Sequence, residues 1–137
     1  MAVKPKTDAP RGILHHNTGK PLTGHARYLP SEKLALFVEH YWFVEWDYTG
    51  HQPQQVETLP HPAVHIVYED GKTEIAGVPK KRFTRLLQGK SFVFGIKFKP
   101  GGFYSFYREP VSKISGKIID GRVLFGGQVE EYGQTVF

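Results

Sequence analysis

The chain has 137 residues, of which 39% are hydrophobic and 14% aromatic, so it can build one domain with a real core but not two domains of ordinary size. Its 18 basic and 13 acidic side chains give a net charge of +5, and the lack of cysteine excludes disulfide frameworks, thiolate zinc sites and cysteine nucleophiles. No apolar run approaches the roughly 18 residues of a membrane-spanning helix, and the first dozen residues lack the apolar centre of a secretory signal. We therefore expect a cytoplasmic protein with no membrane partner.

Fifteen glycines and ten prolines favour many short elements over a few long helices. They punctuate residues 1–30, which predict loop. Residues 1–24 are expected to form a flexible N-terminal arm, in which the apolar pair Ile13 and Leu14 is suited to pairing at a sheet edge.

A long strand is predicted from Leu36 to Tyr48, where β-branched and aromatic residues are enriched and the even-numbered side chains are expected to point inward. Shorter strands are expected at Val56–Leu59, Ala63–Glu69, Thr73–Val78 and Phe83–Leu87. The dipeptide Asp70-Gly71 predicts a two-residue hairpin turn, because that turn needs positive φ.

Residues Ser91–Lys99 carry the clearest strand pattern, with Phe92, Phe94, Ile96 and Phe98 on the inward face. Helical turns are expected at Phe103–Tyr107 and Pro110–Ile114, and short strands at Lys117–Ile119 and Arg122–Phe125. Strands of this length at this spacing are typical of an antiparallel sandwich or barrel.

The sequence offers one weak candidate for a metal site, formed by His61, His65 and Glu69. Imidazole and carboxylate groups bind zinc, iron or manganese. A step of four residues along a strand covers about 13 Å, however, so these three side chains meet at one ion only if the strand bends sharply. We expect no metal and no other cofactor.

Neither catalysis nor nucleic-acid binding is favoured by the remaining motifs. No G-x-S-x-G nucleophile elbow is present. The positive charge is concentrated between Lys72 and Lys99, where strand alternation places lysines and aromatic side chains on opposite faces, unlike a nucleic-acid stacking platform. Pro100, Gly101 and Gly102 lack the spacing of a phosphate-binding loop and predict a tight structural turn. We expect a protein that is not an enzyme.

Aromatic side chains on the inward-facing positions suggest a ligand pocket, since small-molecule sites are mostly apolar with a few convergent polar groups. The alternative, a core filled by the same side chains, is common in small barrels and stays open. The residues expected to line such a pocket are His40, Trp42, Trp46, Tyr68, Phe94 and Phe98.

Three stretches together carry a resemblance to a known family: Tyr28-Leu29-Pro30 with VEHYW at residues 38–42, LPHPAVHIVYEDG at residues 59–71, and VFGIKFKPGGFYSF at residues 93–106. They resemble the N-terminal, cupin-like domain of AraC-type transcription regulators. The resemblance implies a single antiparallel, jelly-roll type barrel over residues 25–126 with short helical segments near its C-terminal end. It also implies that residues 127–137 begin a linker or dimer helix.

The function that the resemblance implies is that of a sensor. A small effector would bind in the barrel, the domain would form a homodimer, and DNA would be reached only through a C-terminal helix-turn-helix region that these 137 residues do not contain. The alternative is a stand-alone cupin, including a metal-dependent enzyme. The resemblance names no effector.

Overall fold

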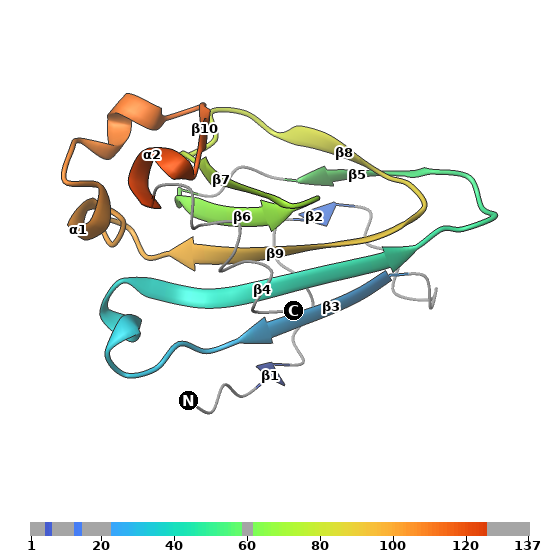
Figure 1. Cartoon of the computed structure of the whole chain (residues 1–137), viewed down its shortest axis with the longest axis horizontal. Coiled ribbons are helices and arrows are strands. Elements are labelled where there is room, and N and C mark those ends of the chain that lie inside the picture. Colours follow the sequence, from blue (N-terminus) through green and yellow to red (C-terminus); the bar gives the residue numbers. More distant parts are fainter. Residues whose placement is uncertain (1–4, 7–12, 15–22, 59–61, 126–137) are drawn as a thin grey trace.

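The structure, a computed structural model, describes residues 5–6, 13–14, 23–58 and 62–125. The fold is mainly β, with two antiparallel sheets and short helical turns that gather at one end of them (Figure 1). The larger sheet contains, in order, β1 (Pro5–Lys6), β3 (Thr23–Tyr28), β4 (Val38–Asp47), β9 (Lys90–Phe98), β6 (His65–Glu69), β7 (Lys72–Ala76) and β10 (Ile118–Asp120). The smaller sheet contains β2 (Ile13–Leu14), β5 (Gln54–Thr58) and β8 (Phe83–Leu87). The turns are η1 (Leu34–Leu36), α1 (Tyr104–Tyr107), η2 (Val111–Ile114) and α2 (Arg122–Phe125).

Most of the predicted strands are confirmed, because alternation and turn residues identify them locally. The two longest form β4 and β9, which pair along almost their whole length. The hairpin turn is confirmed as well: Glu69 pairs with Lys72, and Asp70 and Gly71 have φ of 50° and 73°. The edge pairing predicted for Ile13 and Leu14 is found in β2, which pairs with β5.

Three sequence expectations are wrong. The loop predicted over residues 1–30 contains β3, which pairs with β4 through six residues although it includes Gly24. The strand predicted at Arg122–Phe125 is the turn α2, whose start is fixed by the Asp120 carboxylate accepting a hydrogen bond from the Arg122 backbone N–H at 2.9 Å. Leu36, predicted to point inward, lies in η1 and is 74% exposed.

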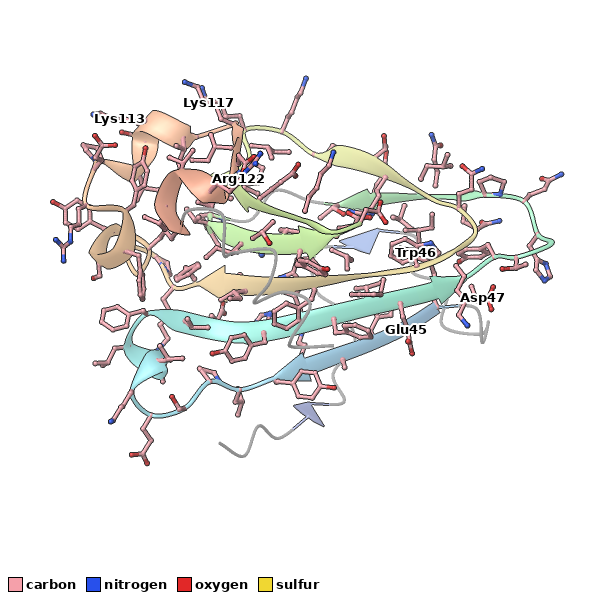
Figure 2. All side chains as sticks on the ribbon, in the orientation of Figure 1. Glu45, Trp46, Asp47, Lys113, Lys117 and Arg122 are labelled. Carbon is pink, nitrogen blue, oxygen red and sulfur yellow. The ribbon has the colours of Figure 1, made fainter. Side chains whose placement is uncertain are left out.

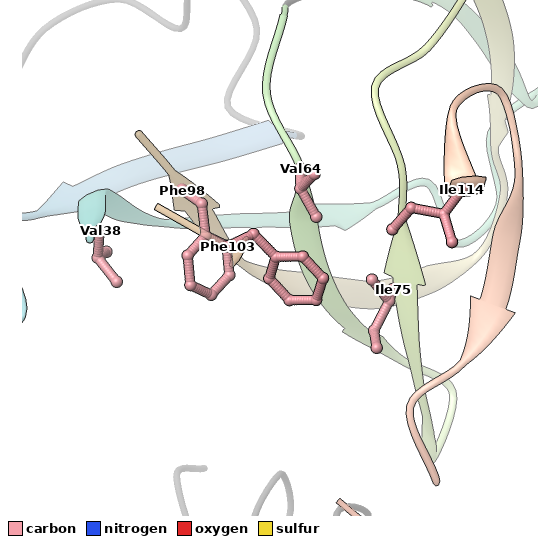
Figure 3. Close-up of a cluster of buried hydrophobic side chains, with 6 residues drawn as sticks. All are labelled: Val38, Val64, Ile75, Phe98, Phe103 and Ile114. Carbon is pink, nitrogen blue, oxygen red and sulfur yellow. The ribbon is translucent and has the colours of Figure 1, made fainter. Parts of the chain in front are cut away.

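The two faces of the large sheet have different coverings. Its inner face is turned toward the small sheet, and the two sheets meet in a cluster of buried side chains: Trp46, Tyr48, Leu87 and Val93. The outer face is covered at one end by the helical turns, over a second cluster that Figure 3 shows: Val38, Val64, Ile75, Phe98, Phe103 and Ile114. Full burial of such side chains stabilises the fold by about 1.5–3 kcal/mol each.

A β-bulge in β4 connects these two environments. The register of β4 with β9 shifts between Val38, which lies opposite Phe98, and His40, which lies opposite Lys97. One extra residue in a strand reverses the facing of everything before it. Val38 therefore joins the outer-face cluster, although the sequence places it on the same face as His40 and Trp42.

In the part of the chain that the structure describes, no helix is long and apolar enough to span a bilayer. The candidate linker helix at residues 127–137 lies outside the described residues, as does most of the candidate arm at residues 1–24.

Candidate functional site on the inner face

The six residues predicted to line a pocket are divided between the two faces of the large sheet. Directly opposed residues of an antiparallel pair share a face. Trp42 lies opposite Gly95, whereas Phe94 lies opposite Phe43 and Tyr68. His40, Trp42 and Trp46 are consequently on the inner face, and Tyr68, Phe94 and Phe98 are on the outer face.

Trp42 lies across three strands of the inner face. Its indole passes over Gly95 of β9, and a methyl group at position 95 would come closer than 3.0 Å to the Trp42 atoms Cε2, Cζ2 and Nε1. Beyond Gly95, the Trp42 Nε1–H donates a hydrogen bond to His65 Nδ1 of β6 at 3.1 Å. The two rings meet edge to face, with centroids 5.9 Å apart. The absence of a side chain at Gly95 is what allows this arrangement.

The hydrogen bond from Trp42 also fixes the chemistry of His65. Because Nδ1 accepts this hydrogen bond, it carries no proton itself, and a neutral imidazole then bears its proton on Nε2. In the neutral form, His65 therefore uses Nδ1 as the acceptor for Trp42 and carries its N–H donor on Nε2.

Next to Trp42 lies a row of nitrogen-bearing side chains. Lys97 of β9 is directly opposite His40 of β4 and His65 of β6, so the three side chains lie side by side on one face. The Lys97 side chain is only 15% exposed, and its Nζ forms an ion pair with Glu39 at 2.9 Å. Glu39 reaches Lys97 because it lies in the β4 bulge. On the other side of Trp42, Arg27 of β3 occupies the opposed position.

A second charged pair joins the two sheets. Arg85 of β8 forms an ion pair with Glu69 of β6, and its guanidinium lies over the Trp46 ring at 5.5 Å from the centroid. Burial lowers the pKa of Arg85, and its Nε is buried without a hydrogen-bond partner. Trp46 is 5% exposed and its Nε1–H donates to the Gln88 carbonyl at 3.2 Å, so this residue is part of the core between the sheets.

The outer-face residues of the predicted pocket have aromatic neighbours. Phe94 stacks with Tyr41 at 6.2 Å between centroids, and burial raises the pKa of Tyr41. Tyr68 packs against Phe92 at 6.3 Å. Phe98 contacts Phe103 edge to face at 5.1 Å and belongs to the cluster under the helical turns.

Comparison with known proteins identifies the family of this domain. Residues 26–120 match the family model of a domain of unknown function, DUF6597. The chain belongs to this family. No curated protein and no solved structure matches the chain. The matched DUF6597 region runs from β3 to β10 and includes the whole Trp42–His65 arrangement and the Lys97 row.

The weak metal candidate is not assembled in the described part of this DUF6597 domain. His65 is bonded to Trp42 and Glu69 to Arg85, at opposite ends of β6. His61 lies outside the described residues. Among the described residues, no group of three or more histidine, aspartate or glutamate side chains is placed to hold a metal ion.

The segment Pro100-Gly101-Gly102 forms a tight turn after β9. The Gly102 N–H donates to the Lys99 carbonyl at 2.8 Å, and Gly101 has a φ of 75°. A methyl group at Gly102 would come closer than 3.0 Å to the Phe37 carbonyl oxygen, which itself accepts the Lys99 N–H at 2.8 Å. The turn therefore lets the chain before α1 pack closely against Phe37, the residue that precedes β4.

A shallow depression of about 220 Å³ lies on the hairpin between β6 and β7. Its lining residues are Val67, Glu69, Asp70, Lys72 and Glu74. Acidic side chains dominate this depression, whereas basic and aromatic side chains dominate the Trp42 region. Glu69, Asp70 and Glu74 thus bring three carboxylates to this end of the hairpin, with Lys72 among them.

Several residues of this site carry no pattern that identifies them in the sequence. Gly95 appears there only as a small residue within a strand, and Glu39 as an outward-facing position. Lys97 is predicted to face solvent with Lys99, but the pairing of β9 with β4 and β6 places it on the inner face. The detectable signal is a glycine in the middle of an otherwise bulky strand, which often marks close approach of another group.

Proposed function

We propose that this DUF6597 domain is a ligand-sensing module that holds a small molecule between its two sheets. The observation that carries the proposal is the Trp42 indole lying over Gly95 and bonded to His65. Aliphatic side chains would suffice for a core that served stability alone, whereas on this face an indole, an imidazole, an ammonium and a carboxylate lie next to one another. Small-molecule sites combine apolar surface with a few polar groups in this way.

The resemblance to the sensor domain of AraC-type regulators agrees with this proposal. In that setting the two sheets form a cupin-like barrel, the effector binds inside it, and binding alters dimerisation or the position of an arm. A ligand achieves this only by binding two arrangements with different affinity. The signal would pass to a helix-turn-helix region, which is how the domain would influence DNA. The domain itself would carry out no catalysis.

Thermal denaturation in the presence of a small-molecule set tests the proposal. A ligand at one hundred times its Kd stabilises the folded state by about 2.7 kcal/mol, which raises the Tm of a domain of this size on the order of 10 °C. We expect a hit to stabilise the wild type and the outer-face control Phe94→Leu, but not Trp42→Phe. Hits that stabilise Trp42→Phe equally would show that the inner face is not the site.

A further inference from the structure

The hydrogen bond between Trp42 and His65 exists in only one charge state of the imidazole. The indole nitrogen is a donor that cannot accept, and it donates to His65 Nδ1 at 3.1 Å. A protonated imidazole carries a proton on both nitrogens and has no acceptor left, so neither a ring flip nor a change of tautomer restores one. Binding of one proton to His65 therefore removes this bond.

Histidine is also the side chain whose charge a mild change of pH alters. Its proton is ordinarily gained or lost between about pH 5 and pH 8. His65 is half-buried on the face of β6 that is turned toward the small sheet. The Trp46 indole offers a contrast within the same chain, because it donates to the Gln88 carbonyl at 3.2 Å, an acceptor that does not titrate.

The surroundings of His65 contain charged groups from several strands. Lys97 lies directly opposite His65 and forms the ion pair with Glu39, whereas the opposed residue on the other side of β6 is Ala76. Among the described residues, the titratable and charged groups on this face and on the sheet packed against it are His25 and Arg27 (β3), Glu39 and His40 (β4), Lys97 and Lys99 (β9 and its end), Glu69 (β6), Lys72 and Glu74 (β7), Asp120 (β10) with Arg122, and Arg85 (β8). A proton on His65 therefore places a second cation next to Lys97 and sets an N–H against the indole N–H.

Trp42 connects this bond to the core between the two sheets. Its partly buried side chain packs against the inter-sheet cluster that contains Leu87 of the small sheet and Val93 of the large one. Residue 95 is glycine, so no side chain at this position of β9 fixes the ring. The bond to His65 uses the single N–H of the indole. Loss of the bond thus frees the ring to move and changes the packing between the sheets.

We propose that Trp42 and His65 form a pH-dependent switch. Neutral His65 holds the indole across β9 against the core between the sheets, and protonated His65 releases it. The proton is exchanged with water, so the switch needs no other reactant. The inference concerns the fold itself and holds whether or not a ligand binds on the inner face.

A titration of the full 137-residue chain from about pH 8 to about pH 5 tests the switch. ¹H–¹⁵N spectra follow the indole N–H signals of Trp42 and Trp46, assigned with Trp46→Phe, and long-range spectra follow the ring nitrogens of His65. We expect the Trp42 signal to move in one step with the same midpoint as the His65 ring. The Trp46 signal should stay in place.

Two variants of His65 separate the acceptor from the titration. In His65→Asn the side-chain oxygen is bonded to Cγ as Nδ1 is, and it accepts a hydrogen bond throughout this pH range. The Trp42 signal of this variant should stay at its neutral-pH position. His65→Leu offers no acceptor, so its Trp42 signal should lie near the low-pH position at every pH. His40→Asn, the matched control on the same face, should leave the titration of Trp42 unchanged.

The wild-type titration decides the matter even if a variant fails to fold. The proposal is overturned if the Trp42 signal stays in place while His65 gains its proton, or if His65 stays neutral over the whole range. A Trp42 titration that persists in His65→Asn, or disappears in His40→Asn, would also overturn it. Circular dichroism at the same pH values follows the fold, and unfolding of the whole domain before the Trp42 signal moves would exclude a local switch.

Discussion

Gly95→Ala is the sharpest perturbation of the inner face. The added methyl group would come closer than 3.0 Å to three atoms of the Trp42 indole, including the Nε1 that donates to His65. The indole is a rigid ring, so it must move as a whole. Overpacking of this kind costs about 1–3 kcal/mol, and loss of a buried hydrogen bond costs about 0.5–1.5 kcal/mol.

One opposing effect reduces the expected loss. Alanine has less backbone entropy than glycine in the unfolded chain, which returns about 0.5–1 kcal/mol. The net destabilisation is therefore about 0.5–4 kcal/mol, and its upper part is a large share of the roughly 5–15 kcal/mol that holds a domain folded. Urea denaturation followed by circular dichroism measures this difference.

Gly24→Ala is the matched control, because Gly24 is also a glycine inside a strand of the same sheet. A methyl group there would lie 3.1 Å from Glu45 Oε1 and 3.2 Å from its Cγ. Glu45 is an exposed and flexible side chain that can give way. Because alanine brings the same backbone-entropy gain of about 0.5–1 kcal/mol here, we expect the free energy of unfolding of this variant to stay unchanged or to rise by up to about 1 kcal/mol.

A double-mutant cycle identifies the cause of the loss. In a Trp42→Leu background the indole is gone, and Gly95→Ala should then cost little more than Gly24→Ala does. The reasoning would be refuted if Gly95→Ala were as mild as Gly24→Ala in the wild type, or if its cost were the same with and without Trp42.

Three further predictions concern the turn, the tautomer and the surface. Gly102→Ala should lower the free energy of unfolding more than Gly101→Ala, which should lose only the roughly 1–2 kcal/mol of a left-handed non-glycine residue; equal losses in urea denaturation would contradict the contact described at Gly102. Long-range ¹H–¹⁵N spectra should show neutral His65 with its proton on Nε2, and the opposite tautomer would exclude the bond from Trp42. The Arg122 side chain, and also its backbone N–H, lowers the pKa of the Asp120 carboxyl to about 2, so the ¹³C shift of this carboxyl should titrate near pH 2. The contribution of the pair to stability is present above the ordinary pKa of aspartate and is lost as the pH falls toward 2. In Arg122→Gln the titration should move to higher pH, and an unmoved titration would be evidence against the pair.

The last of these groups lies at the surface near the helical turns. Figure 2 shows Arg122 at that end, with Lys113 and Lys117, far from Trp46 at the other end of β4. Lys113 is paired with Glu109 at 3.4 Å, and both side chains are more than half exposed. Such exposed pairs add little stability. We therefore expect substitutions of these side chains to leave the inner face unchanged.

Strand positions are predictable from this sequence because alternation and turn chemistry are local signals. The period-2 pattern in β4 and β9 and the Asp70-Gly71 turn each depend on a few neighbouring residues. β3 escaped prediction because its burial is only partial and its composition, which includes Gly24, is weak for a strand.

The grouping of site residues depends on register, which no single strand contains. The sequence places Trp42 and Phe94 together as inward-facing residues, but the pairing sets Trp42 opposite Gly95 and so sends Phe94 to the other face. The bulge at Glu39 is equally non-local, since it is defined by how β4 meets β9. The alternation pattern therefore places His40, Trp42 and Trp46 on one face together, but it does not show which residues of the neighbouring strands share that face.

The central claim is that a small molecule binds on the inner face beside Trp42. The most direct measurement is an NMR screen of a mixed set of charged and neutral fragments against the full chain, following the Trp42 and Trp46 indole signals. The account predicts that at least one fragment shifts the Trp42 signal in a saturable manner and shifts the Trp46 signal less. It would be contradicted if no fragment moved the Trp42 signal, or if the hits moved that signal only because they unfolded the domain.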